Sequence, residues 1–442
     1  MARAIRRSFL KHAGLATMGL PLLRTSGRAS ENEQLHIGCI GVGGKGWSDM
    51  METAKSPHVT VQAICDIDSG PQHLGRAAEQ FPKASQYRDW RNLLDKEKLD
   101  AVIVSTPDHM HAPIAMSAIQ RGLHVYCQKP LTHTIHEARA LTNAAKKAGV
   151  VTQMGNQIQS YGEYRTAVQL VHDGAIGKVK EVYSWQAGTP RWPRAIDRPT
   201  GSHPVPKTLH WDQWLGVAPE RPYLNEMYHP FRWRGWRDFS NGQLGDFGCH
   251  ILDPVFMSLE LTAPTQFKVQ APPIHPETWT KSARVEYVFP GTQYTAGSTI
   301  KVTWIDGEGV KPVEELSAIV KESELPNAGS VLIGEKGSLM IPHVSAPKLY
   351  PLEKFADYEM PQLERLSHYV VWADACRGVG TTKSHFGYAG NLTETVLLGT
   401  IGIRIPDTTL HWDAANMKIS GHDDASGYLS KTYRRGWEVE GL

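Results

Sequence analysis

The sequence lacks several features that would assign it to a protein class at once. Its 442 residues include only five cysteines, at positions 39, 65, 127, 249 and 376, and no Cys-x-x-Cys pair. Buried thiols are therefore expected rather than a zinc site or a disulfide framework. No apolar run reaches the roughly 20 residues that a membrane span needs. Internal repeats and low-complexity tracts are also absent.

Basic clusters are lacking beyond the N-terminus. Residues 1–30 carry six basic and no acidic residues, which leaves 41 basic and 45 acidic residues in the remainder, a net charge of −4. Without a basic stripe, no nucleic-acid partner is expected.

The N-terminus itself carries an arginine pair before a short apolar stretch, "RRSFLKHAGLATMGLPLL" at 6–23. This pattern resembles a twin-arginine export signal. We therefore expect residues 1–30 to be a signal peptide that sends the protein through the twin-arginine machinery to the periplasm. A basic amphipathic surface helix remains the alternative.

A glycine-rich turn follows this segment. The stretch "LHIGCIGVGGKGWSDMMETA" (35–54) passes from a strand pattern into a helical one, and a second strand pattern ends in Asp66, twenty residues beyond the last glycine of the turn. This spacing is typical of the dinucleotide-binding fingerprint, in which glycines permit a tight turn, close approach to a pyrophosphate and close helix packing. The glycines concerned are Gly41, Gly43, Gly44 and Gly46. Asp66 would bind the adenosine ribose and repel a 2′-phosphate, so NAD is favoured over NADP.

Apolar strand patterns continue to alternate with helical ones, at 101–115, 124–132 and 150–157. Such alternation predicts a parallel sheet covered on both faces, and ligands of these sheets bind at the carboxyl ends of the strands. The residues expected beside the cofactor there are Thr106, Pro107, His111, Gln128, Lys129 and Asn156.

As a set, these motifs resemble the Gfo/Idh/MocA family (glucose–fructose oxidoreductase, inositol dehydrogenase and rhizopine catabolism). The resemblance includes "STPDHMHAP" (105–113), the Lys129-Pro130 turn and an Asp-x-Gly-x-His motif at 246–250. It implies an α/β fold, with a Rossmann NAD-binding domain at 33–157. An α/β domain with an open, largely antiparallel sheet would follow at 158–442. One residue departs from the family pattern: Gln128 stands where Glu is usual, which removes a possible partner of Lys129.

The stretch "GQLGDFGCHILD" (242–253) admits several interpretations. Asp-Phe-Gly occurs in protein kinases, but the other kinase motifs are missing. A helix would align Asp246, His250 and Asp253 on one face, as metal ligands would be. Asp246 could also be a helix N-cap beside a buried histidine. Proton transfer by Asp246 and His250 is the interpretation that we favour, with no metal.

Oxidation of a secondary alcohol by a nicotinamide needs a base for the hydroxyl proton, and an imidazole is suited to that task near neutral pH. We therefore predict that His250 and Lys129 flank the reacting oxygen. Asp246 would orient the imidazole ring or bind a neighbouring hydroxyl.

Aromatic residues gather before this stretch, with six of the thirteen tryptophans between 183 and 236. Aromatic faces and arginines suit a carbohydrate. Trp185, Arg232 and Trp233 are the predicted substrate contacts, together with Asp246 and His250. Core packing is the alternative for the tryptophans. The Pro-, Arg- and Gly-rich segment 186–210 could close over the site or reach another subunit of an expected homo-oligomer.

Three functions follow from these observations. The leading hypothesis is an NAD-dependent oxidoreductase acting on a secondary hydroxyl of a sugar, cyclitol or glycoside. The second is an NAD-dependent glycosidase that works by transient oxidation, elimination and re-reduction. A non-catalytic nucleotide or sugar sensor is the third.

Overall fold

The computed structural model describes residues 34–442, so the predicted export signal at 1–30 lies outside the described residues. The N-terminal half contains a parallel sheet of order β3-β2-β1-β4-β5-β6. Its strands are β1 Leu35–Ile40, β2 Val59–Cys65, β3 Ser85–Tyr87, β4 Ala101–Val104, β5 His124–Cys127 and β6 Thr152–Met154. The strand order reverses at β1, with β2 on one side and β4 on the other, which is where ligands bind in such sheets.

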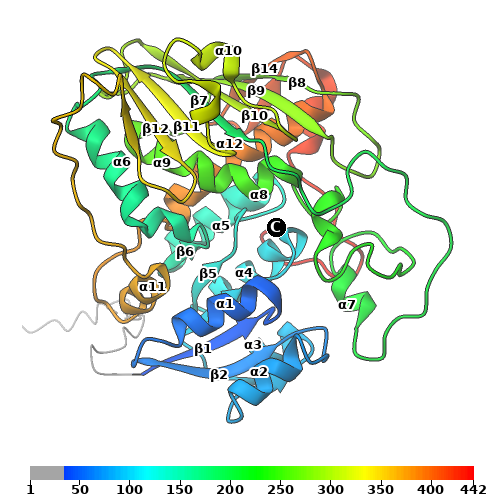
Figure 1. Ribbon diagram of the computed structural model, residues 1–442. Helices are drawn as coiled ribbons and strands as arrows, with labels where there is room; N and C mark the ends of the chain where they lie inside the picture. Colours follow the sequence, from blue (N-terminus) through cyan, green and yellow to red (C-terminus); the bar gives the residue numbers. More distant parts are fainter. Residues whose placement is uncertain (1–33) are drawn as a thin grey trace, which may run out of the picture.

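Helices cover both faces of this sheet (Figure 1). They are α1 Gly44–Thr53, α2 Leu74–Gln80, α3 Trp90–Lys96, α4 His111–Gln120 and α5 Ile135–Ala148. Helix α5 shows how locally these bounds are set. Thr134 and Glu137 form a reciprocal capping box at its start, and Gly149 ends it with a φ of 66°.

The second sheet has nine strands in the order β13-β12-β11-β7-β10-β9-β8-β14-β15, antiparallel except for the β7–β10 pair. The strands are β7 Val179–Gln186, β8 Gln266–Gln270, β9 Ser282–Pro290, β10 Thr299–Gly307, β11 Ala328–Gly334, β12 Ser338–Pro342, β13 Lys348–Tyr350, β14 Thr409–Asp413 and β15 Lys418–Ser420. Strand β9 alternates buried and half-buried residues, as expected of a sheet that is packed mainly on one face. This architecture confirms the predicted fold class.

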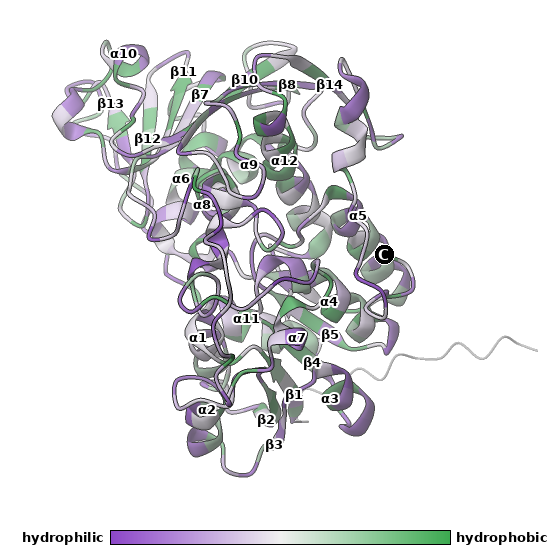
Figure 2. Ribbon diagram, turned by 90° about the vertical axis from the view of Figure 1, so that its right-hand side faces the viewer, coloured by the Kyte–Doolittle hydropathy of each residue, from purple (hydrophilic) through white to green (hydrophobic). Residues whose placement is uncertain are grey.

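Four helices cover one face of the second sheet and separate it from the Rossmann domain (Figure 1). They are α6 Gly162–His172, α8 Gly242–Ile251, α9 Asp253–Leu259 and α12 Phe386–Arg404. The opposite face carries a smaller apolar cluster around α10 Val313–Leu316. Figure 2 shows the strands and the buried helices largely in the hydrophobic colour, with the connecting loops hydrophilic.

Two segments from the C-terminal half pack against the Rossmann domain. Helix α11 His368–Cys376 packs beside α1, where Tyr369 and Trp372 join the apolar core of β1 and β4. A long excursion before α8, which includes α7 Trp211–Leu215, passes beside α2 and α3 (Figure 1). Short 3-10 turns lie at Asp108–Met110, Gln157–Ser160, Arg232–Gly235, Glu322–Glu324 and Asp423–Tyr428.

The five cysteines are buried and unpaired, as predicted. Among the described helices, none is long and apolar enough to cross a membrane.

Candidate active site

The glycine-rich turn adopts the geometry that its spacing predicts at two of its four glycines. Gly41 has a φ of 80°, and a Cβ there would lie 2.7 Å from the Ser105 carbonyl oxygen. A Cβ on Gly46 would lie 1.7 Å from the Gly41 carbonyl oxygen, so only glycine lets α1 pack this close to the turn. The space beside Gly44 is open, with no atom within 4 Å of a Cβ.

Gly43 differs from the prediction. The space that a Cβ would fill there is taken by the imidazole of His73, 2.1 Å away. Glycine at position 43 therefore leaves room for the side chain of His73. The neighbouring backbone N–H groups can still bind a pyrophosphate.

Asp66 lies directly after β2 and holds the turn in place. Its Oδ2 accepts hydrogen bonds from the backbone N–H groups of Val42 (2.9 Å) and Gly43 (3.1 Å), and its Oδ1 accepts one from Asp68 N (3.0 Å). A carboxylate has about four acceptor positions, so Oδ1 keeps capacity for a ribose hydroxyl. We call this part of the site the adenosine end, because the acid after β2 binds the ribose in dinucleotide-binding folds.

A segment from the C-terminal half crosses the adenosine end. In this segment, residues 206–230, which we call the strap, Thr208 O accepts from Ser69 N at 2.9 Å and His210 N donates to Ile67 O at 3.0 Å. His229 Nε2 lies 3.0 Å from Asp68 Oδ2. The strap is therefore tied by main-chain and side-chain contacts to the residues that follow Asp66.

The carboxyl ends of β4 and β6, together with α8, form what we call the nicotinamide end, and they carry buried polar atoms without partners in the described chain. They are Thr106 Oγ1 after β4, Asn156 Nδ2 after β6, and His250 Nδ1 on α8. Leaving such atoms unpaired is costly, so three of them, on residues after β4 and β6 and on α8, fit a site built for a polar ligand. These residues, with the open glycine turn, fit NAD.

Not every residue predicted to touch the cofactor is free to do so. Pro107 follows Thr106 and is the N-cap residue of the 3-10 turn at Asp108–Met110. His111 is fully buried, and its two ring nitrogens lie 2.8 Å from the carbonyl oxygens of Pro130 and Thr106. Burial lowers the pKa of His111 to about 4, so the ring is neutral and can donate a hydrogen bond to only one of these two oxygens.

Gln128, the departure from the family pattern, has a partner that explains it. Its Nε2 donates to Asp49 Oδ2 at 2.9 Å, and Ser105 Oγ donates to the same oxygen at 2.8 Å. Asp49 lies on α1, is fully buried, and also pairs with Lys45. A glutamate at 128 would face the Asp49 carboxylate, so the amide is what this buried acid requires.

Lys129 and Asp246 meet between the two domains. Lys129 Nζ lies 2.5 Å from Asp246 Oδ1, and Arg234 Nε lies 3.3 Å from the same oxygen. Burial alone would raise the pKa of Asp246, but the charges of Lys129 and Arg234 outweigh it and hold this pKa well below its usual range. Asp246 therefore replaces the missing glutamate as the partner of Lys129. It makes no hydrogen bond to His250 within the described chain, so the prediction that it orients the imidazole is not supported.

His250 lies one helical turn from Asp246 with 8% of its surface exposed. Burial, then the nearby charge of Lys129 and the ring of His343, lower the pKa of His250 well below its ordinary value. The His343 ring centroid is 6.1 Å away. At neutral pH, His250 is thus an uncharged imidazole that can accept a proton.

The helix around His250 ends earlier than the sequence pattern indicates. Helix α8 begins at Gly242 after Asn241, so Asp246 is not its N-cap, and α9 begins at Asp253. Asp253 faces elsewhere and accepts hydrogen bonds from Gln159 (2.9 Å) and Tyr388 (2.6 Å). The three residues of the metal interpretation therefore do not converge.

Two of the predicted substrate contacts lie away from these groups. Trp185 is fully buried in β7 on the side of the second sheet that faces α10, and its indole N–H donates to Pro326 O at 2.9 Å. It is a core residue, and its prediction as a substrate contact is wrong. Arg232 is exposed, and Trp233 is buried with its ring 4.3 Å from the guanidinium of Arg234. Arg234, not Arg232, reaches Asp246.

Sequence reasoning missed three residues that the structure adds to the site. Arg234 and Asp49 are described above. Asp108, in the "STPDHMHAP" motif, is buried and accepts from Asn241 N at 3.2 Å. Burial raises the pKa of Asp108 to about 7, against the charges of Lys129 and Arg234. Asp108 could have been found from the sequence, since it lies inside the "STPDHMHAP" motif. No sequence rule, however, places its side chain near Lys129.

A possible metal-binding group lies at the adenosine end instead. Among the described residues, ligand atoms of Asp68, His73 and His229 lie within 4.8 Å of one another. The same three side chains form the contact between the strap and the Rossmann domain, so ion pairing already accounts for them.

Two family models match the chain. The oxidoreductase family, NAD-binding Rossmann fold, matches residues 35–156, and the C-terminal alpha/beta domain of the oxidoreductase family matches residues 170–316, so that more than half of the chain is matched. The chain belongs to the Gfo/Idh/MocA oxidoreductase family. This assignment confirms NAD as the cofactor and an oxidoreductase fold around the site.

Individual relatives are more distant. Glycosyl hydrolase family 109 protein 1 of Shewanella sp. strain ANA-3 is 28% identical over an aligned length of 227 residues, and the match covers 45% of this chain and 49% of that protein. Levoglucosan dehydrogenase of Pseudarthrobacter phenanthrenivorans is 28% identical over 154 residues, 33% of this chain and 39% of that protein. The chain thus spans about half the length, or less, of these curated relatives.

A solved structure supports the fold over a wider range. The WlbA dehydrogenase from Bordetella pertussis, in complex with NADH and UDP-GlcNAcA, aligns with a TM-score of 0.61 at 15% identity, over 86% of this chain and 99% of that one.

Proposed function

We propose that the protein is an NAD-dependent oxidoreductase that acts on a secondary hydroxyl of a sugar, cyclitol or glycoside. The observation that carries this proposal is the placement of Lys129 from the Rossmann domain against Asp246, one turn before His250 on α8. The charge of Lys129 acts on His250, whose Nδ1 is one of the buried polar atoms without a partner among the described residues. A relative is named a levoglucosan dehydrogenase, which supports a carbohydrate substrate.

Each of the three residues has a separate task. The neutral His250 imidazole accepts the hydroxyl proton of the substrate as the carbon is oxidised, and returns it in the reverse direction. The Lys129 ammonium donates a hydrogen bond to the same oxygen and stabilises the negative charge that develops there. Asp246 fixes Lys129 and balances its charge, because an unpaired buried ammonium would be costly.

The cofactor, when bound, supplies the hydride acceptor and donor. The chain holds it with the glycine turn at the N-terminus of α1, where unpaired N–H groups favour a pyrophosphate. The strap over the adenosine end favours slow release.

The first test identifies the bound nucleotide and the direction of chemistry. Mass spectrometry of the purified full chain after denaturation should detect close to one NAD per chain. Absorbance at 340 nm should then rise when the loaded protein is mixed with a reactive sugar or cyclitol from a screen. A chain that carries no nucleotide and binds none on addition would contradict the proposal and would leave a sugar-binding sensor.

A second function is favoured by two observations. A relative is named a glycosyl hydrolase family 109 protein, and the strap suits a cofactor that stays bound between turnovers. In a redox-neutral glycosidase, the sugar is oxidised, the aglycone is eliminated, water adds, and the hydride returns to the same carbon. Cleavage of an aryl glycoside with no net rise at 340 nm would support this function. Accumulation of NADH with an unsubstituted sugar would support the dehydrogenase.

The remaining parts of the proposal concern the cell and the assembly. The arginine pair at Arg6 and Arg7 supports export through the twin-arginine machinery to the periplasm. Because that pathway transports folded proteins, NAD would be acquired before export. We also propose a homo-oligomer. Fractionation of cells that produce the full chain, and of cells that produce an Arg6→Lys, Arg7→Lys variant, tests the export. Light scattering of the loaded protein tests the assembly.

A further inference from the structure

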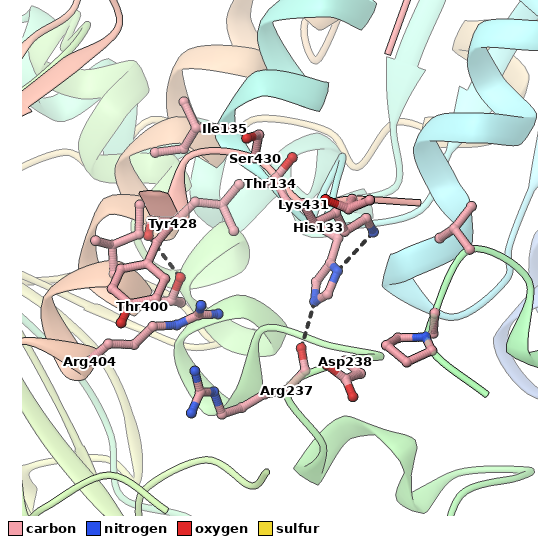
Figure 3. A pocket seen from close by; sticks show the side chains of 16 residues that line it. His133, Thr134, Ile135, Arg237, Asp238, Thr400, Arg404, Tyr428, Ser430 and Lys431 are labelled. Atoms are coloured by element: carbon pink, nitrogen blue, oxygen red, sulfur yellow. Dashed lines mark hydrogen bonds between the residues drawn. The ribbon is translucent and has the colours of Figure 1, made fainter. Parts of the chain in front are cut away.

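A second charged cavity lies outside the proposed active site. It is formed where the end of α12, the segment before α8 and the C-terminal tail meet the start of α5 (Figure 3). Its empty volume is about 710 Å³, part of which opens to solvent. The charged residues around it are Arg237, Asp238, Arg404 and Lys431, and we call it the C-terminal pocket. Lys129, Asp246 and His250 do not line it.

Arg404 has no acceptor in this pocket. It is the last residue of α12, and its guanidinium lies 4.8 Å from the Tyr428 ring and 5.6 Å from the Trp279 ring. Its Nε is buried without a hydrogen-bond partner, and no carboxylate of the described chain pairs with it. Aromatic faces satisfy part of a cation but none of its N–H groups.

Arg237 lies on the opposite wall, and its guanidinium is only partly satisfied by the described residues. Its Nη1 donates to the carbonyl oxygens of His275 (3.2 Å) and Pro276 (2.9 Å), but its Nε is buried without a partner. Figure 3 shows the guanidinium groups of Arg237 and Arg404 directed toward each other across the cavity. Burial, together with the charge of Arg237, lowers the pKa of Arg404 to about 10, as expected for two cations that face each other.

The carboxylates near the pocket are already engaged. Asp238 pairs with Arg221. Glu137 lies 3.1 Å from Lys431 Nζ and accepts from Tyr433 at 2.6 Å. His133 accepts from Lys431 at 3.0 Å, and burial lowers the pKa of His133 well below its usual value, so this ring adds no charge. The charge of Asp238 also acts on Arg237 and Arg404, but no carboxylate of the described residues forms an ion pair with either guanidinium.

We propose that the C-terminal pocket is a binding site for a doubly charged oxyanion of the phosphate or sulfate class, held between Arg237 and Arg404. A guanidinium offers a planar pair of N–H donors that matches two oxygens of such an anion. The anion would join α12 to the segment that precedes α8, and so bind two elements that are far apart in sequence. This proposal is independent of the proposed function.

The test is thermal unfolding of the NAD-loaded full chain in inorganic phosphate and, at equal ionic strength, in chloride. Matching ionic strength removes general screening from the comparison. Ten millimolar phosphate should raise the unfolding midpoint by about 1 to 3 °C over chloride, as expected for a ligand present above its Kd. Sulfate should act similarly and acetate less. An equal midpoint in phosphate and chloride would overturn the site.

Variants locate the effect. Arg404→Gln and Arg237→Gln should each lose the phosphate-dependent rise, and Arg121→Gln should keep it, because Arg121 pairs with Asp95 at a distant surface. Titration calorimetry with inorganic phosphate should give one site per chain in the wild type and in Arg121→Gln, and no binding in Arg237→Gln. If Arg404→Gln does not fold, the Arg237→Gln titration decides. Unchanged binding in Arg237→Gln would overturn the proposal.

Discussion

The adenosine end and the nicotinamide end of the cofactor site differ in how many of their polar groups have hydrogen-bond partners among the described residues. At the adenosine end, Asp66 accepts three backbone hydrogen bonds, and the strap is tied to the residues beside it. At the nicotinamide end, Thr106 Oγ1, Asn156 Nδ2 and His250 Nδ1 are buried without partners. The first end holds its shape without a ligand, and the second is left incomplete.

This difference separates binding from chemistry. A pre-formed adenosine end costs little reorganisation when the cofactor binds, so it determines affinity. The nicotinamide end keeps its free donors and its neutral imidazole for groups that change during the reaction, so it determines the rate. Substitutions at the two ends should therefore affect different kinetic quantities.

The largest effect is expected at the nicotinamide end. His250→Ala removes the proposed proton acceptor and should lower kcat by about 10² to 10⁴, the usual contribution of general acid–base catalysis. The dissociation constant of NAD should change by less than about threefold, since the binding contacts at the adenosine end stay in place. Steady-state kinetics and a fluorescence titration of NAD measure the two quantities.

The matched control is His343→Ala, which removes the neighbouring imidazole. The ring of His343 lies 6.1 Å from that of His250, and its Nδ1 pairs with Tyr164 OH at 3.0 Å. Its loss should leave kcat within about fivefold of the wild type, since it takes no part in proton transfer. Equal losses in the two variants would mean that neither ring is the specific base.

At the adenosine end the expected effect is on affinity. Asp66→Asn removes the charge that the ribose hydroxyls and the glycine turn bind, and hydrogen bonds to a charged group are worth about 1.5 to 3 kcal/mol. The Kd of NAD should therefore rise by up to about 100-fold while kcat at saturating NAD stays close to the wild type. Asp100→Asn is the control, because Asp100 lies at the amino end of β4, whereas Asp66 follows the carboxyl end of β2. A loss of kcat without a change in Kd would reverse the comparison.

The adenosine end was also the more predictable of the two. The glycine turn and Asp66 lie within about thirty residues, and the φ angle at Gly41 and the close packing at Gly46 follow from that local pattern. Helix and strand patterns likewise gave the parallel sheet and the alternation of β9. Short-range sequence determines these features, because the atoms that interact are close along the chain.

The nicotinamide end depends on contacts between distant residues. Lys129 and Asp246 were both predicted, but their pairing joins residues 117 positions apart and no local rule gives it. Gln128 stands where the family usually has Glu because its amide donates to Asp49, which lies 79 positions away. Trp185 failed as a prediction because strand alternation leaves two faces to choose from, and only the folded sheet shows which one packs on α8.

The pH dependence of stability tests whether Asp108, beside the nicotinamide end, is buried in its neutral form. Burial raises the pKa of Asp108 to about 7 from 3.8. The folded chain therefore binds a proton that the unfolded chain has released, and stability falls as pH rises from about 4 to about 7. Asp108→Asn keeps the acceptor for Asn241 N and should reduce this fall. The loss of unfolding free energy between pH 5 and pH 8 should be smaller in the variant than in the wild type by about 2 kcal/mol.

Urea unfolding at pH 5 and pH 8 measures this difference. The buried acids Asp253 and Asp306 also have raised pKa values, about 7 and about 6, so the wild type should retain part of its pH dependence in the variant. Comparing the two proteins at both pH values cancels that shared part. A variant with the same pH dependence as the wild type would show that Asp108 is ionised throughout this range.

The smallest expected effect concerns the strap. His229→Ala removes its side-chain link to Asp68, while the main-chain contacts of Thr208 and His210 remain. A partly buried hydrogen bond of this kind contributes about 0.5 to 1 kcal/mol, so the release rate of NAD should rise about two- to fivefold. His210→Ala is the control, since that side chain is exposed on the same segment. Transfer of bound NAD to an excess of a second NAD-binding protein gives the rates. If both variants release NAD at the wild-type rate, the strap does not retain the cofactor, and the structural support for a redox-neutral cycle is lost.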